Sequence, residues 1–224
     1  MTKMALSSIA CIHEYCINTE TRELFLHIDQ GSSEEMLDWR AANRFIKNLS
    51  ILESINHKPI VVHQCTCGGD WNYGMAIYDA IRTAQSPIAL LAHAHARSMS
   101  SIIPQAADFR AIMPSADFMI HFGTETIDGD AKSVIANVEW SKVQIEQMLN
   151  VYADRLVSSP FFKTKRWSAK KIKEEFLNPE LNTRRECYWT AQNAVVYGFM
   201  DAVYGTLRCK TLSDLRRAAL RACS

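Results

Sequence analysis

The sequence has few of the residues that build linkers, disulfide frameworks or membrane spans. Only 8 of its 224 residues are Gly and 6 are Pro, and no stretch is of low complexity, so we expect one domain over residues 1–224. The 7 Cys are scattered and form no C-x-x-C pair, which favours free thiols over disulfides or zinc. No run reaches the ~18 uninterrupted apolar residues of a membrane span. The N-terminus reaches Glu14 too soon for a secretory signal, so we expect a cytoplasmic protein.

An excess of charge of one sign is also lacking. Lys and Arg number 25 against 24 Asp and Glu, for a formal net charge of +1. A nucleic-acid-binding domain usually carries a basic stripe, whereas the basic run over residues 163–171 is followed by Glu174 and Glu175 and indicates a solvated helix face. We therefore expect neither a nucleic acid nor a membrane as partner.

Hydrophobic periodicity predicts strands that alternate with helices. The expected strands are residues 22–28, 60–65, 88–92, 109–113, 117–121 and 199–204. The expected helices begin at the capping-box spacing of Ser32 and Glu35 and continue with residues 73–84, 99–107, 131–156, 168–177 and 190–197. This alternation is typical of an α/β fold with a mainly parallel sheet and crossover helices.

Two features with possible chemistry follow predicted strands. The glycine pair 68–69 lets the backbone turn tightly and direct N–H groups into a cleft at the carboxyl end of a strand, although, taken alone, an ordinary strand-to-helix turn is the commoner explanation of such a pair. Ser98 precedes an apolar helix, where its hydroxyl could act as a nucleophile and the Met99 N–H could stabilise an oxyanion. Ser98 could also be a plain N-cap, with Ser100 and Ser101 as rival caps.

Histidines lie at several strand ends. His121 closes the apolar segment F-M-I-H and precedes Gly123, which places it to reach a cleft, although such a residue is often structural. His93 and His95 form an H-x-H that could bind a metal, but no third ligand follows at a suitable spacing. We therefore predict no metal site and no cofactor.

Four sequence blocks occur together in the chain, in the order and near the spacing of one known family. They are C-G-G-D-W-N-Y-G-M-A-I-Y-D-A-I (67–81), A-R-S-M-S-S (96–101), M-P-S-A-D-F-M-I-H (113–121) and W-T-A-Q-N-A-V-V-Y-G-F-M-D (189–201). With these blocks the chain resembles the proteolytic subunit of the ATP-dependent Clp protease over residues 20–204. The resemblance implies a crotonase-like, Clp-protease-like spiral of mainly parallel strands. It also implies a projecting interface helix at 131–156 and an insertion-like segment at 157–181.

The resemblance also implies a serine-peptidase site. By position, Ser98 matches the nucleophile, His121 the general base and Glu186 the acid. The N–H groups of Gly69 and Met99 match the oxyanion hole. Substrate binding would fall to Gly68, Gly69 and Phe122.

The chain departs from the family at several of these positions. Glu186 stands where the family has Asp, so its carboxylate has a different reach, and Asp201 or a Ser–His dyad remain alternatives. Arg97 replaces a small residue, Ser100 replaces a glycine, and C-T-C over residues 65–67 replaces N-S-P. Such divergence is typical of a phage- or virus-borne relative.

The activity implied is that of a serine endopeptidase that cleaves peptide bonds through an acyl-enzyme inside an oligomeric chamber. The resemblance further implies a homo-oligomer of heptameric rings and an ATPase unfoldase that feeds polypeptide substrates into it. Two alternatives stay open. One is a catalytically impaired ring subunit or scaffold, and the other is a crotonase-type acyl-CoA enzyme.

Overall fold

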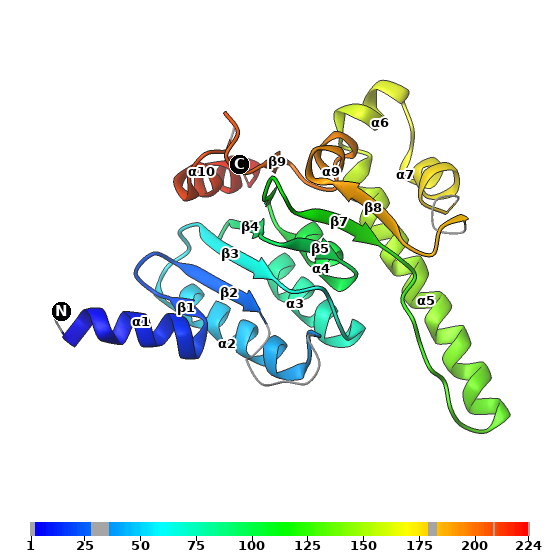
Figure 1. Ribbon diagram of the computed structural model, residues 1–224, viewed down its shortest axis with the longest axis horizontal. Helices are drawn as coiled ribbons and strands as arrows, with labels where there is room; N and C mark the ends of the chain where they lie inside the picture. The colour runs from blue at the N-terminus through cyan, green and yellow to red at the C-terminus, as the bar shows by residue number, and fades with distance from the viewer. Residues whose placement is uncertain (1–2, 28–35, 179–182, 208, 224) are drawn as a thin grey trace.

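The computed structural model describes residues 3–27, 36–178, 183–207 and 209–223. It has a mixed α/β architecture around a six-stranded sheet of order β1-β2-β3-β4-β6-β9 (Figure 1). Every neighbouring pair in this sheet is parallel except β1 and β2. The strands are β1 (Ile17–Asn18), β2 (Glu23–His27), β3 (Ile60–Cys65), β4 (Ile88–Ala92), β6 (Phe109–Ile112) and β9 (Ala202–Val203).

The central strands are apolar because both of their faces are covered. Every residue of β4 is buried. Helices α2 (Trp39–Ile55) and α3 (Trp71–Thr83) contribute to the main core cluster with one set of strand residues. Helix α10 (Leu212–Ala222) lies against β3, β4 and β6 and forms a second cluster with the alternate set, which includes Val61, Ala89 and Leu91.

Of the other helices in the described ranges, α1 precedes the first strand and the rest connect strands. They are α1 (Lys3–Tyr15), α4 (Met99–Ile102), the 3₁₀ turn η1 (Ile103–Ala106), α5 (Ala131–Leu156), α6 (Pro160–Lys165), α7 (Ala169–Ile172), the π-helical turn η2 (Lys173–Leu177) and α9 (Ala191–Tyr197).

The predicted elements of the large sheet agree closely with the structure. The strands expected at 60–65 and 88–92 and the helix expected at 131–156 have the observed bounds. The first crossover helix was predicted to begin too early. In the described residues α2 begins at Trp39, and Asp38 caps it by accepting from the N–H groups of Arg40 and Ala41. The capping-box residues 32–35 lie outside the described part of the chain.

Other boundaries differ because local geometry changes within a predicted element. The helix expected at 99–107 is α4 followed by η1, where Pro104 interrupts regular helical bonding. The helix expected at 168–177 becomes π-helical after α7. The strand expected at 199–204 is only the short β9. Helices α1, α6 and α10 and strands β1, β5 and β8 were not predicted.

A second sheet, of three short strands, lies beside the large one (Figure 1). Its strands are β5 (His95–Arg97), β7 (Asp117–Ile120) and β8 (Cys187–Thr190), in the order β5-β7-β8. Strand β7 is parallel to β5 and antiparallel to β8. Strand β8 is far from β5 and β7 in the sequence, so only the tertiary fold brings it beside β7.

Helix α5 has two different halves. Its C-terminal half is buried in the main core, through residues such as Met148, Tyr152 and Leu156. Its N-terminal half projects away from the body of the molecule (Figure 1) and exposes Ile135 and Trp140.

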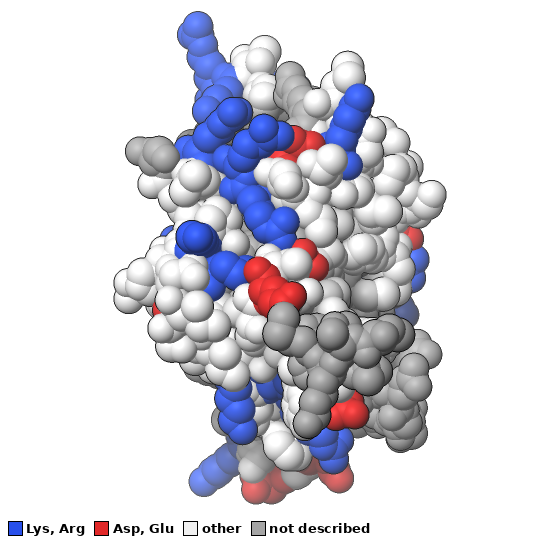
Figure 2. Space-filling model, turned by 90° about the vertical axis from the view of Figure 1, so that its left-hand side faces the viewer, with Lys and Arg blue, Asp and Glu red and all other residues white. Residues whose placement is uncertain are grey.

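The charged surface on the α1 and α10 side is mixed. Figure 2 shows Lys and Arg side chains gathered on the upper part of this face, with acidic side chains directly beside them. Helix α10 itself takes part in two ion pairs, Arg216 with Glu23 and Arg217 with Asp214. None of the helices in the described ranges is long and apolar enough to cross a membrane.

Candidate active site

The three-stranded sheet aligns three segments that carry polar side chains. Arg97 pairs with Met119 across β5 and β7, and the Ser98 N–H donates to the Met119 carbonyl at 3.1 Å. Ile120 pairs with Cys187 across β7 and β8. Ser98 and His121 follow their strands, whereas Glu186 precedes an antiparallel strand. All three residues therefore lie at the same end of the small sheet.

Ser98 has an unusual backbone conformation for a residue with a side chain. Its φ is 52° and its ψ is −130°, a region that costs on the order of 1–3 kcal/mol for a non-glycine residue. Gly68, with φ of 115°, lies directly against it. A Cβ atom at Gly68 would be 2.8 Å from the Ser98 Cβ and 3.0 Å from the Met99 nitrogen. Glycine is therefore needed here for the close approach of the two segments.

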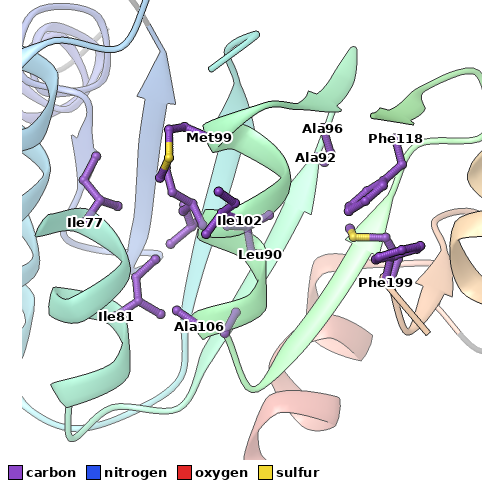
Figure 3. Packing of buried hydrophobic residues seen from close by; sticks show 14 of the residues in the cluster. Ile77, Ile81, Leu90, Ala92, Ala96, Met99, Ile102, Ala106, Phe118 and Phe199 are labelled. Carbon is purple, nitrogen blue, oxygen red and sulfur yellow. The ribbon is translucent and has the colours of Figure 1, made fainter. Parts of the chain in front are cut away.

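The start of α4 is held by packing as well as by hydrogen bonds. Figure 3 shows the Met99 and Ile102 side chains of α4 lying toward Ile77 of α3 in the hydrophobic core. A Cβ atom at Gly74 of α3 would come within 2.3 Å of the Met99 Cε, so the two helices are in close contact. The Gln64 side-chain amide donates to the Ser100 carbonyl at 2.8 Å.

Two backbone N–H groups near Ser98 have no acceptor in the described parts of the chain. Gly69 forms a parallel bridge with Leu37, in which Leu37 N–H donates to the Gly68 carbonyl and Asp70 N–H donates to the Leu37 carbonyl. This pattern leaves the Gly69 N–H without a backbone acceptor among the residues that the structure describes. Met99 begins α4, and the N–H of a first-turn residue has no acceptor within its own helix.

The Ser98 hydroxyl is directed to His121 and not to the helix. Ser98 occupies the N-cap position of α4, but within the described residues its side chain makes no capping hydrogen bond. The Ser98 Oγ lies 2.8 Å from the His121 Nε2. The rival Ser101 hydroxyl donates to the Ser98 carbonyl at 2.6 Å and lies 2.6 Å from the Tyr152 hydroxyl. The structure thus contradicts the plain capping interpretation of Ser98.

The electrostatic surroundings of His121 favour its neutral form. The imidazole is half-buried, and this burial lowers the pKa of His121 below its ordinary value. The negative charge of Glu186 acts in the opposite direction, but it is the smaller effect. A neutral imidazole with a hydroxyl at its Nε2 can accept the hydroxyl proton.

Glu186 lies near His121, but its carboxylate is bonded to another group. The Tyr188 hydroxyl donates to the Glu186 Oε2 at 2.9 Å. No hydrogen bond joins Glu186 to His121 within the described ranges. Asp201, the alternative acid, is bound instead by the Arg110 guanidinium at 2.6 and 2.9 Å and also accepts from the Arg110 N–H. Asp201 therefore has a structural role in the large sheet.

All the predicted site residues line one cavity of about 1330 Å³. Apolar side chains such as Met119, Ile145 and Met148 form part of its wall, which suits a ligand with hydrophobic groups. The predicted site residues in its lining are Gly68, Gly69, Ser98, Met99, His121, Phe122 and Glu186.

Sequence reasoning missed the side chains that surround Glu186. Arg97 and Tyr188 also line the cavity, and the Arg97 guanidinium lies 5.4 Å from the centre of the Tyr188 ring. Arg97 is one of the departures from the family in the sequence, but no local pattern predicts that its side chain meets Tyr188.

The other histidines lie elsewhere. The His93 Nε2 is 3.0 Å from the His63 Nδ1, so His93 is part of a histidine pair on the large sheet. Within the described ranges no group of three or more potential ligands is arranged to hold a metal ion.

Comparisons with known proteins agree on one family. The family described as Clp protease matches residues 26–206. The chain is 27% identical over 165 residues to the "ATP-dependent Clp protease proteolytic subunit 2" of Treponema denticola, covering 72% of this chain and 74% of the relative. It is 26% identical over 170 residues to the "ATP-dependent Clp protease proteolytic subunit" of Deinococcus radiodurans, covering 75% and 76%. The "ATP-dependent Clp protease proteolytic subunit 3" of Nocardia farcinica is 24% identical over 188 residues, covering 83% and 76%.

Proposed function

The chain belongs to the Clp protease family, and on that basis we propose that it is a serine endopeptidase that works through an acyl-enzyme. The observation that carries the proposal is the 2.8 Å contact between the Ser98 Oγ and the His121 Nε2 inside the cavity. A serine hydroxyl is a weak nucleophile until an adjacent base accepts its proton, and this contact provides the base.

The proposed reaction has two stages. His121 takes the proton of the Ser98 hydroxyl as the oxygen attacks a peptide carbonyl and forms a tetrahedral intermediate. The imidazolium then gives this proton to the amine nitrogen as the C–N bond breaks, which leaves an acyl-enzyme on Ser98. In the second stage His121 activates a water molecule in the same way, and the acyl group leaves as a carboxylic acid.

The proposed oxyanion hole consists of the Gly69 and Met99 N–H groups. Gly69 follows Gly68, which lies against Ser98, and Met99 follows Ser98 directly. Both residues line the cavity, and among the described residues neither N–H group donates to a backbone acceptor in the Leu37 bridge or in α4. Such donors stabilise the negative charge that develops on the carbonyl oxygen in the transition state. Gly68 and Phe122 are proposed to contact the substrate from the same cavity.

Glu186 is proposed as the acid that orients His121 and stabilises the imidazolium. Glu186 lines the same cavity, and its negative charge acts to raise the pKa of His121 against the larger lowering by burial. The lack of a bond to His121 in the described structure favours one alternative, a catalytically impaired ring subunit or scaffold. The Ser98–His121 contact opposes an acyl-CoA enzyme, because that chemistry needs no serine nucleophile.

The proposed setting is that of the family. We propose a crotonase-like spiral that assembles into heptameric rings and receives polypeptides from an ATPase partner. The exposed half of α5, with Ile135 and Trp140, is the proposed contact between copies, because exposed apolar patches usually mark interfaces.

The test combines covalent labelling with peptide hydrolysis. The purified protein should react with a fluorophosphonate probe and hydrolyse fluorogenic peptides, and Ser98→Ala should lose both properties. Ser54→Ala, at an exposed position of α2, serves as the matched serine control. Equal labelling of the Ser98→Ala variant and the native chain would overturn the proposal.

A further inference from the structure

A network of four polar side chains runs across the small sheet next to the proposed site. The Arg97 Nε and Nη2 donate to the two Asp117 carboxylate oxygens at 2.7 and 2.5 Å. The Arg97 guanidinium lies over the Tyr188 ring, and the Tyr188 hydroxyl donates to Glu186. The network therefore ends on the carboxylate proposed as the acid.

The pairing of the strands explains why these side chains meet. Arg97 and Tyr188 both pair directly with Met119, so the three side chains lie on one face of the sheet. Asp117, two residues before Met119, lies on the same face, as does Glu186, two residues before Tyr188. The network thus joins the segment before Ser98, the strand that leads to His121 and the strand that follows Glu186.

An exposed glutamate needs such support because its side chain is long and free to rotate. Glu186 is exposed, and its side chain has one more rotatable bond than the aspartate of the family. Holding a long side chain in one conformation costs conformational entropy, which a fixed hydrogen-bond donor offsets. The Tyr188 hydroxyl binds the Oε2 atom, and no other donor to Glu186 is seen among the described residues, so the Oε1 atom is the one proposed to accept from the His121 imidazole.

We propose that Tyr188 is a positioning residue for Glu186 and that Arg97, fixed by Asp117, holds the Tyr188 ring in place. This inference rests on the proposed peptidase function and deepens it. In this role Tyr188 acts through Glu186 and not on the reacting atoms. Glu186, so held, orients the imidazole for both stages of the reaction.

The first test is a double-mutant cycle on peptide hydrolysis. Tyr188→Phe keeps the ring under Arg97 but removes the hydroxyl, and we expect kcat to fall about tenfold, the value of one hydrogen bond to a charged group. In a Glu186→Gln background the same change should have little further effect on kcat, because the carboxylate that Tyr188 positions is no longer there. Tyr15→Phe, at an exposed position on α1, is the control.

A supporting variant tests the Arg97 part of the network. Arg97→Lys keeps the positive charge but cannot bind Asp117 through two parallel N–H groups. We expect a smaller loss of kcat in the same direction as that of Tyr188→Phe.

The second test does not depend on activity. In a Ser98→Ala background the pKa of His121 is measured by NMR titration with and without Tyr188→Phe. Because the Glu186 charge raises this pKa, loss of positioning should lower it. The other charged side chains around the cavity are unchanged in both samples, and they are Asp38, Arg40, Asp70, Arg97 and Glu125.

The opposite result would overturn the inference. If Tyr188 withholds Glu186 from His121, Tyr188→Phe will raise both kcat and the pKa of His121. An equal pKa of His121 with and without Tyr188→Phe would show that Tyr188 has no part in positioning Glu186. A native chain that takes no fluorophosphonate label would refute the peptidase function, while the NMR titration would still decide the role of Tyr188.

Discussion

The two sheets of this molecule differ in what their strands bury and in the residues that lie at their ends. In the large sheet, β4 is buried throughout and helices cover both faces. In the small sheet, Ala96, Phe118 and Cys187 are buried, while Arg97 and Tyr188 face the cavity. The large sheet is therefore covered by apolar packing on both faces, and the small sheet aligns the proposed site residues. This division predicts that mutations in the two sheets will have different consequences.

The largest expected effect is at the end of the small sheet. Ser98→Ala should reduce kcat by about 10⁶, as loss of a nucleophile does in other serine peptidases. The same change should leave the free energy of unfolding nearly unchanged, because the hydroxyl makes no capping bond to α4 in the described structure. Steady-state hydrolysis checks the loss of kcat, and urea denaturation checks the free energy of unfolding. A large loss of stability would contradict the separation of the two sheets.

Glu186→Gln is expected to have the next largest effect on activity. Loss of a well-aligned acid costs about 10⁴ in kcat, and we expect a smaller loss because Glu186 makes no hydrogen bond to His121 among the described residues. The melting temperature should not change, since Glu186 is exposed. Unchanged hydrolysis by Glu186→Gln would favour a Ser–His dyad.

In the large sheet the expected effect is on stability. Leu90 is fully buried in β4, and Leu90→Ala should lower the free energy of unfolding by about 2–5 kcal/mol through loss of burial and creation of a cavity. At temperatures where the variant is folded, kcat per labelled serine should match that of the native chain. A selective loss of kcat in fully folded protein would show that the two sheets are not independent.

Asp201→Asn separates the two candidate acids. Asp201 binds the buried Arg110 guanidinium in the large sheet, so its loss should destabilise the fold by about 2 kcal/mol. The pH profile of the remaining activity should keep its shape, because Asp201 does not line the cavity. A shifted profile would restore Asp201 as a candidate for the triad.

The smallest expected effect concerns pH. His121 must be neutral to act as a base, and burial lowers its pKa below the ordinary 6.5. The kcat/KM value should therefore fall as pH decreases, with a midpoint below 6.5, and it should be on its plateau at neutral pH. A midpoint above this value would show that the Glu186 charge outweighs burial in solution.

The sequence by itself predicted most of the large sheet. Strands β3 and β4 are short apolar runs between turn residues, and their burial by helices follows from that local pattern. Helix α5 was predicted with its observed bounds from its apolar periodicity and its length. The order of the Ser98 and His121 motifs identified the pair that the structure brings within hydrogen-bond distance.

Two of the three strands of the small sheet, β5 and β8, could be recognised only in the tertiary structure. Strand β5 is H-A-R and β8 is C-Y-W-T, and neither is long or regular enough to be recognised by periodicity. Each is a strand because it pairs with β7, and β8 is distant from β7 in the sequence. The motif alignment placed Glu186 near His121, but its hydrogen-bond partner is Tyr188. The conformation of an exposed carboxylate depends on neighbours from other strands, and local sequence does not specify those neighbours.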